Sequence, residues 1–192
     1  MKIIFLDIDG VLNSRDWYMR REDRSKDPGL KERDFSYEFD PEAIDLLNYI
    51  EDKTHAKVVV SSTWRLGRRV EDLQKILDDA GFYGEIIDKT PSMHCRIDGQ
   101  PAGYRIPRGC EIDWWLSKNG EFQRINWSKK KQQEYLDKAI VKNYVILDDD
   151  SDMLYNQREH FVRTSNLYGL TKENADRCIE ILNKSLIELY YE

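Results

Sequence analysis

Three unbroken runs of apolar, β-prone residues constrain the fold of this chain more than any other feature. The runs cover residues 3–6, 58–60 and 144–147. Such runs are typical of strands that are buried on both faces of a parallel sheet. A shorter stretch at residues 160–163 predicts one further strand near the end of the chain.

Amphipathic helical patterns lie between these runs and after them. Asp40 followed by Pro41 is a typical helix N-terminus, and Gly81 is a typical left-handed helix end. The predicted helices begin after Asp40, cover residues 70–80, cover residues 111–116 with an end at 119–120, and begin after Thr171. Strands that alternate with helices indicate an α/β fold, here a doubly wound three-layer α/β/α sandwich with a mainly parallel sheet.

The length of the chain sets the expected domain organisation. With 192 residues, and about 150 residues in a typical domain, we expect a single domain over residues 1–192. Small insertions are expected near residues 14–39 and 83–107. These two segments and residues 121–133 lack a clear periodicity, so we expect loops or small excursions around the sheet.

Composition excludes several classes of function. The formal net charge of −6 has the wrong sign for a protein that coats nucleic acid, although a local basic patch can still guide a phosphate. No apolar run approaches the roughly 20 residues that cross a bilayer, so we expect a cytoplasmic protein without membrane contact. The three cysteines form no C-x-x-C pair, which argues against a disulfide framework or a zinc site. We expect reduced thiols, with Cys178 in a helix core.

Polar residues follow the three runs directly, at Asp7, Ser61 and Asp148. The carboxyl ends of parallel strands meet at one edge of a sheet, where ligands bind in doubly wound folds. Asp9 lies two residues beyond Asp7, where Gly10 permits the chain to turn. Because none of the three histidines has metal-ligand spacing to another, carboxylates are expected to carry any reaction.

This order of features resembles the haloacid dehalogenase (HAD) superfamily, whose signature is an apolar strand followed by D-x-D-G. A strand that ends in Ser61, a basic residue before a helix, and the acidic cluster at residues 148–152 follow in the matching order. The resemblance spans about residues 2–165. In detail the chain is similar to the phosphatase domains of multidomain RNA-repair proteins, of the polynucleotide 3′-phosphatase type. The matching segments are residues 6–13, 61–65, 108–109 with 115–116, and 147–152.

The resemblance implies a role for each acidic residue. Asp7 would be the nucleophile that forms an aspartyl phosphate, and Asp9 the general acid and then the base. A Mg²⁺ ion would bind the side chains of Asp7 and Asp148 and the backbone carbonyl of Asp9. Asp148 followed by Asp149 matches a paired-acid pattern, whereas Asp148 with Asp152 matches a D-x-x-x-D pattern. We rank Asp149 before Asp152 as the further metal ligand.

The resemblance also implies residues that bind the phosphoryl group. Ser61 would donate a hydrogen bond to a phosphoryl oxygen, and the Ser62 amide would add to this cradle. Arg65 is similar to an arginine of polynucleotide phosphatases that holds the phosphate, although a carboxylate-paired arginine is an alternative. Arg108 is the candidate for the basic residue before the next helix, and Arg105 competes with it.

The implied function is hydrolysis of a phosphomonoester at a polynucleotide end, with a 3′-phosphate as the expected substrate. The small insertions imply a small or absent cap, which leaves room for a bulky substrate. Hydrolysis of free 5′- or 3′-nucleotides is an alternative with the same chemistry. A catalytically silent binding module with the HAD fold is a third hypothesis. Trp64, Trp114 and Trp115 are interpreted as core or rim aromatic residues.

Overall fold

A computed structural model describes residues 1–21, 35–95, 104–119 and 140–184. A five-stranded sheet with the order β3-β2-β1-β6-β7 forms its centre, and every neighbouring pair of strands is parallel. The strands are β1 (Lys2–Leu6), β2 (Lys57–Val60), β3 (Ile86–Lys89), β6 (Asn143–Asp148) and β7 (Phe161–Arg163). The strands predicted from the three apolar runs and from residues 160–163 are all present.

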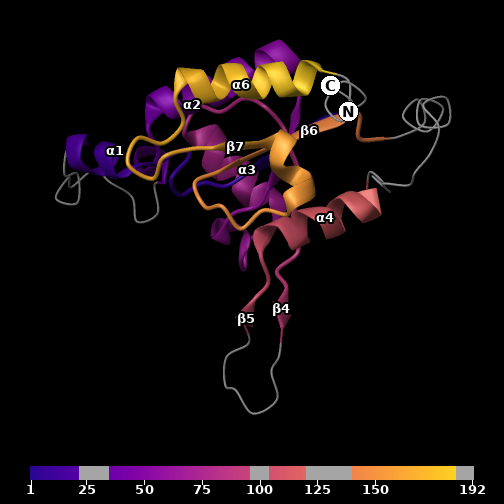
Figure 1. Cartoon of the computed structure of the whole chain (residues 1–192). Helices are drawn as coiled ribbons and strands as arrows, with labels where there is room; N and C mark the ends of the chain where they lie inside the picture. Colours follow the sequence, from indigo (N-terminus) through magenta and orange to yellow (C-terminus); the bar gives the residue numbers. More distant parts are fainter. Residues whose placement is uncertain (22–34, 96–103, 120–139, 185–192) are drawn as a thin grey trace.

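Helices cover both faces of the sheet (Figure 1). On one face, α2 (Pro41–Thr54), α3 (Val70–Asp79) and α6 (Lys172–Asn183) pack against Ile4 and Leu6 of β1. On the other face, α4 (Arg108–Asn119) packs against Ile3 and Phe5 of the same strand. Alternate residues of β1 therefore belong to two separate cores, as expected for a strand buried on both faces. This arrangement confirms the predicted doubly wound α/β/α sandwich.

The helix ends largely follow the sequence signals. The Asp40 side chain accepts a hydrogen bond from the Glu42 amide at 3.0 Å at the start of α2. Gly81, which follows the C-cap residue Ala80 of α3, has a φ of +98°. Helix α4 begins at Arg108, three residues earlier than predicted, where the Arg108 amide donates to Asp152 Oδ2 at 2.8 Å. This helix start depends on a residue far away in the sequence, so local periodicity did not reveal it.

Two of the three segments expected to be loops or small excursions, residues 14–39 and 83–107, contain regular structure. The prediction was wrong for Ile86–Lys89, which forms β3 at the edge of the sheet and pairs with β2 alone. This strand has only two apolar residues, which is too short a run to recognise by periodicity. The other elements are α1 (Arg15–Arg20), the 3-10 helix η2 (Ser36–Glu38), and the antiparallel pair β4 (His94–Cys95) and β5 (Tyr104–Arg105). Residues 121–133 lie outside the described part of the chain.

Two further sequence expectations concern cysteines and membrane spans. Cys110 and Cys178 are free thiols, and Cys178 is fully buried against the sheet, as predicted. The side chain of Cys95 lies outside the described structure. Within the described ranges, every helix is too short or too polar to span a membrane.

Candidate active site

The predicted polar residues come together at the carboxyl ends of three neighbouring strands, β1, β2 and β6. Beyond the last paired residues of β1, the Asp7 amide still donates to the Leu147 carbonyl of β6 at 2.9 Å. On the other side, the Ser61 amide donates to the Leu6 carbonyl at 2.8 Å. The residues that follow β1 and β2 therefore lie next to each other, and Asp148 ends β6 beside them.

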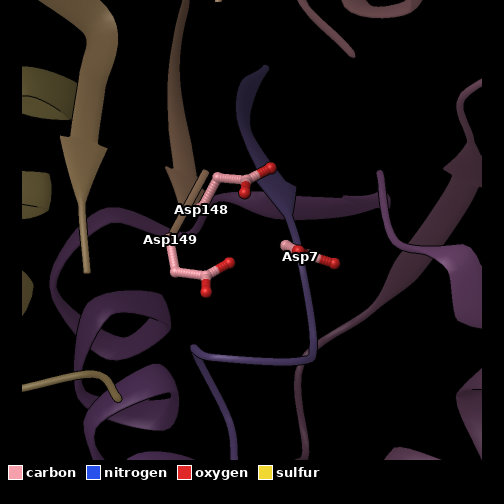
Figure 2. Close-up of side chains that lie close together, drawn as sticks. All are labelled: Asp7, Asp148 and Asp149. Atoms are coloured by element: carbon pink, nitrogen blue, oxygen red, sulfur yellow. The ribbon is translucent and has the colours of Figure 1, made fainter. Parts of the chain in front are cut away.

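Asp7, Asp148 and Asp149 form a group of carboxylates at these strand ends. Each offers an oxygen atom, and these atoms lie within 4.8 Å of one another. Figure 2 shows Asp148 and Asp149 at the end of one strand, with their side chains on the side that faces Asp7. Asp7 is 6% exposed and Asp148 is 0% exposed. The fold thus concentrates negative charge in a place that water reaches poorly.

Arg108 supplies positive charge to this group from the first residue of α4. Its Nη1 atom lies 2.9 Å from Asp7 Oδ1 and 3.2 Å from Asp148 Oδ2. The same nitrogen donates a hydrogen bond to the Ser61 carbonyl. The structure therefore places Arg108 against the acidic group, whereas the side chain of Arg105 lies outside the described part.

The oxygen atoms of this group fit a hard divalent cation. Asp148 Oδ2 is buried and accepts no hydrogen bond from the described residues, although Arg108 Nη1 lies 3.2 Å away. Arg108 Nη1 is shared with Asp7 and the Ser61 carbonyl, so a second cation would lower the cost of burying these carboxylates. Since the donor set consists of carboxylate oxygens alone, it suits Mg²⁺ better than a softer metal. Asp7, Asp148 and Asp149 are the residues that would hold such an ion.

The structure distinguishes the acidic residues that follow Asp148. Asp149 lies against the turn after β1, because a Cβ atom added at Gly10 would lie 2.4 Å from Asp149 Cγ. Gly10 also has a φ of +74°, so a glycine is needed here for two reasons. Asp152 instead accepts the Arg108 amide and caps α4. Asp149, which the sequence ranked second after Asp148 and before Asp152, is therefore the acid that lies with Asp7 and Asp148.

Asp9 occupies a different position, at the exposed rim of the site. Its carboxylate accepts hydrogen bonds from the Trp64 indole, with 3.1 Å from Nε1 to each oxygen. Asn13 Nδ2 also donates to Asp9 Oδ1 at 3.0 Å. The sequence assigned no catalytic or binding role to Asn13, and it interpreted Trp64 as a core or rim aromatic residue. Asn13 could have been found, since it lies four residues after Asp9 in the matching segment 6–13, but no local pattern links Trp64 to Asp9.

Ser61 and Ser62 are buried beside the nucleophile candidate. Ser61 Oγ accepts a hydrogen bond from Thr90 Oγ1 at 3.3 Å, and the Ser62 side chain forms a hydrogen bond with Asp7. Ser62 Oγ also accepts the Trp64 amide at 3.4 Å. Both serines therefore lie where the sequence expected them, and their hydrogen bonds to phosphate remain predictions.

Arg65 takes the carboxylate-paired alternative rather than the expected position facing a phosphate. Its Nη2 atom lies 2.5 Å from Glu111 Oε2, and both side chains are buried. Its three guanidinium nitrogens also donate to backbone carbonyls, namely those of Ser62, Thr90 and Pro91. The expectation that Arg65 grips the phosphate is therefore not supported, because its donors tie the 3-10 helix η3 (Thr63–Arg65) to α4.

A comparison with known protein families agrees with this geometry. The model of the family described as "HAD domain in Swiss Army Knife RNA repair proteins" matches residues 3–175. The chain belongs to this HAD family. Searches of curated proteins and of solved structures found no match. The family match supports a hydrolase of the HAD phosphatase type, in agreement with the resemblance seen in the sequence.

Burial controls the protonation of this HAD site. Burial raises the pKa of Asp148 to about 8, and the charge of the neighbouring Asp7 acts in the same direction. Burial likewise raises the pKa of Asp7, against the opposing effects of Arg108 and of hydrogen bonds from Ser62 and the Ile8 amide. Arg108 thus offsets only part of the repulsion between the buried carboxylates of Asp7 and Asp148.

We expect the metal-free protein to lose stability as the pH rises from about 4 to about 8. The reason is that the folded state retains protons on Asp148 and Asp7 that the unfolded chain releases in this window. Thermal unfolding in EDTA at a series of pH values measures this effect. Asp148→Asn should remove most of the slope, whereas Asp176→Asn, on the surface of α6, should leave it unchanged. A wild-type midpoint that rises across this window would contradict the expectation.

Proposed function

We propose that this HAD domain is a Mg²⁺-dependent phosphomonoester hydrolase that works through an aspartyl phosphate at Asp7, on the 3′-phosphate of a polynucleotide end. One observation carries the proposal: the Asp7 carboxylate lies at a strand end together with Asp148, Asp149 and the guanidinium group of Arg108. A nucleophilic carboxylate needs negative charge on itself and positive charge around the phosphoryl group. This group of residues provides both.

The residues of the chain divide the reaction between them. An Asp7 oxygen forms a bond to phosphorus while the bond from phosphorus to the ester oxygen breaks, and Asp9 gives its proton to that oxygen. A water molecule then attacks phosphorus and gives a proton back to Asp9, and the bond to Asp7 breaks to release phosphate. Arg108 and the amides after Ser61 offset charge on the phosphoryl oxygens. Mg²⁺, held by Asp7, Asp148, Asp149 and the Asp9 carbonyl, adds further charge compensation when it is bound.

Two features support a polynucleotide over a smaller phosphate ester. The family description refers to RNA repair proteins, so a nucleic-acid end is a consistent substrate. Arginine–aromatic pairs also lie on the side of the site where Asp9 is found. Arg21 lies over the Tyr18 ring at 4.4 Å and Arg68 over the Trp64 ring at 5.4 Å. Such pairs suit both phosphates and bases.

Free nucleotides are the second candidate substrate, because they carry the same phosphate, sugar and base. A catalytically silent binding module is the third candidate, and the complete set of acids argues against it. Phosphate release by Asp7→Asn and by wild type, and the preference between oligonucleotide and mononucleotide, distinguish these functions.

Asp7→Asn should reduce phosphate release to less than about one-thousandth of the wild-type rate, because an amide cannot replace the nucleophilic carboxylate. The assay is release of inorganic phosphate from a 3′-phosphorylated oligoribonucleotide in the presence of Mg²⁺. Asp45→Asn, an exposed acid on α2, is the matched control and should retain full activity. Equal activity of Asp7→Asn and wild type would exclude Asp7 as the nucleophile. An inactive wild type that still binds Mg²⁺ would favour the silent module.

Gly10→Ala should weaken Mg²⁺ binding at least about tenfold, because the added methyl group meets the Asp149 carboxylate. Calorimetric titration with Mg²⁺ measures this affinity. Gly67→Ala is the matched control, since Gly67 has a φ of +72° and nothing within 4 Å of the added Cβ. Both variants carry a strain of about 1 kcal/mol, but Gly67→Ala should bind Mg²⁺ like wild type. Normal Mg²⁺ binding by Gly10→Ala would argue against Asp149 as a ligand.

A 3′-phosphorylated oligoribonucleotide should be hydrolysed with a kcat/KM at least about tenfold above that of a 3′-mononucleotide, since more of its chain contacts the protein. The same oligonucleotide with a 5′-phosphate tests the choice of end. Equal or faster turnover of mononucleotides would establish the nucleotidase alternative. Preference for the 5′-phosphate would keep the polynucleotide substrate and overturn the choice of the 3′ end.

A further inference from the structure

The contact between Trp64 and Asp9 has no counterpart in the roles that the HAD resemblance implied. We propose that Trp64 is a positioning residue, whose indole N–H holds the Asp9 carboxyl group in place for proton transfer to the leaving group. This inference rests on the proposed function, because Asp9 has this task only in a phosphatase. It adds a residue, from the segment after β2, on which the transfer depends.

The geometry of the contact restricts the Asp9 side chain. A single indole N–H faces both carboxylate oxygens, with 3.1 Å from Nε1 to each. Asn13 Nδ2 donates to Oδ1 from another direction at 3.0 Å. Asn13 is itself fixed, because its Oδ1 accepts the Gly10 amide at 3.0 Å. Asp9 is exposed, so without these donors its side chain would be free to change rotamer.

The indole ring is held firmly enough to act as a support. The rings of Phe35 and Phe39 lie 5.7 Å and 5.3 Å from the Trp64 ring. Arg68 lies over the same ring, and its Nη1 donates to the Trp64 carbonyl at 2.9 Å. Ser62 Oγ accepts the Trp64 amide. Contacts on the ring and on the backbone thus fix the direction of the N–H group.

The chemistry of an indole suits this task. An indole N–H is a donor only, and it does not titrate in water. It can therefore donate to both oxygens of the Asp9 carboxylate, or to the carbonyl oxygen of the protonated acid, without taking part in the proton transfer. In the first step that proton passes to the ester oxygen as its bond to phosphorus breaks and Asp7 bonds to phosphorus. In the second step a water molecule returns a proton to Asp9. Trp64 neither gains nor loses a proton in either step.

Trp64→Phe tests the inference, because phenylalanine keeps the aromatic packing and removes the N–H group. The measurement is kcat/KM for a series of phosphate monoesters, from alkyl esters to aryl esters with strongly acidic leaving groups. The leaving oxygen of an alkyl ester must be protonated as it departs, whereas the phenolate of an acidic phenol can depart without a proton. We expect a loss of about ten- to hundredfold for alkyl esters, and a loss of less than about threefold for the best leaving groups.

Trp17→Phe is the matched control. The Trp17 indole nitrogen is buried and has no hydrogen-bond partner among the described residues, so its removal should not alter the dependence on the leaving group. An equal loss for all esters would indicate a merely structural role for Trp64 and overturn the inference. Unchanged or faster hydrolysis of alkyl esters by Trp64→Phe would overturn it too. Absence of turnover in wild type, of these esters and of the 3′-phosphorylated oligoribonucleotide alike, would contradict the proposed function itself, and the inference with it.

A second measurement does not depend on activity. In ¹H–¹⁵N spectra, the indole signal that disappears in Trp64→Phe identifies Trp64. This signal should shift in Asp9→Ala, where the acceptor is lost, while the Trp17 signal stays in place. An unchanged Trp64 signal would show that the contact does not exist in solution and would overturn the inference, even for an active enzyme.

Discussion

The position of β1 between two parallel partners is the constraint on which the site depends. Residues 3–6 pair in register with residues 57–60 of β2 and with residues 144–147 of β6. The residues that follow β1 and β2, and the last residue of β6, therefore lie together at the carboxyl ends of the strands. This register brings Asp7, Ser61 and Asp148 together from three distant parts of the chain. A slip of one residue would turn the acids toward opposite faces.

The carboxylates at this site repel one another, and a neighbouring helix supplies positive charge that reduces this repulsion. Burial and mutual repulsion raise the pKa values of Asp7 and Asp148. Arg108 offsets part of this charge, and it reaches both acids because α4 begins at these strand ends. Asp152, from the same acidic cluster, fixes that start by accepting the Arg108 amide. The acids of residues 148–152 therefore have separate tasks, since Asp152 caps the helix that brings Arg108 to Asp7 and Asp148.

The short segment after β2 also divides its work between neighbouring residues. Arg65 points inward, where its ion pair with Glu111 joins this segment to α4. Breaking one partner of such a buried pair is strongly destabilising, so Arg65 is needed for the architecture. Trp64 points outward, where it contacts Asp9. The inward anchor and the outward hydrogen bond together fix this segment beside the nucleophile.

The sequence by itself determined the parallel sheet, the helix starts at Asp40 and Thr171, and the acids of the site, because apolar runs, caps and the D-x-D-G motif are local signals. It did not reveal β3, whose short run has no distinctive period. The internal pairing of Arg65 was open in the sequence, and the contact of Trp64 with Asp9 was absent from it. Only the tertiary structure decided these, because each depends on a partner that is remote in the chain and close in space.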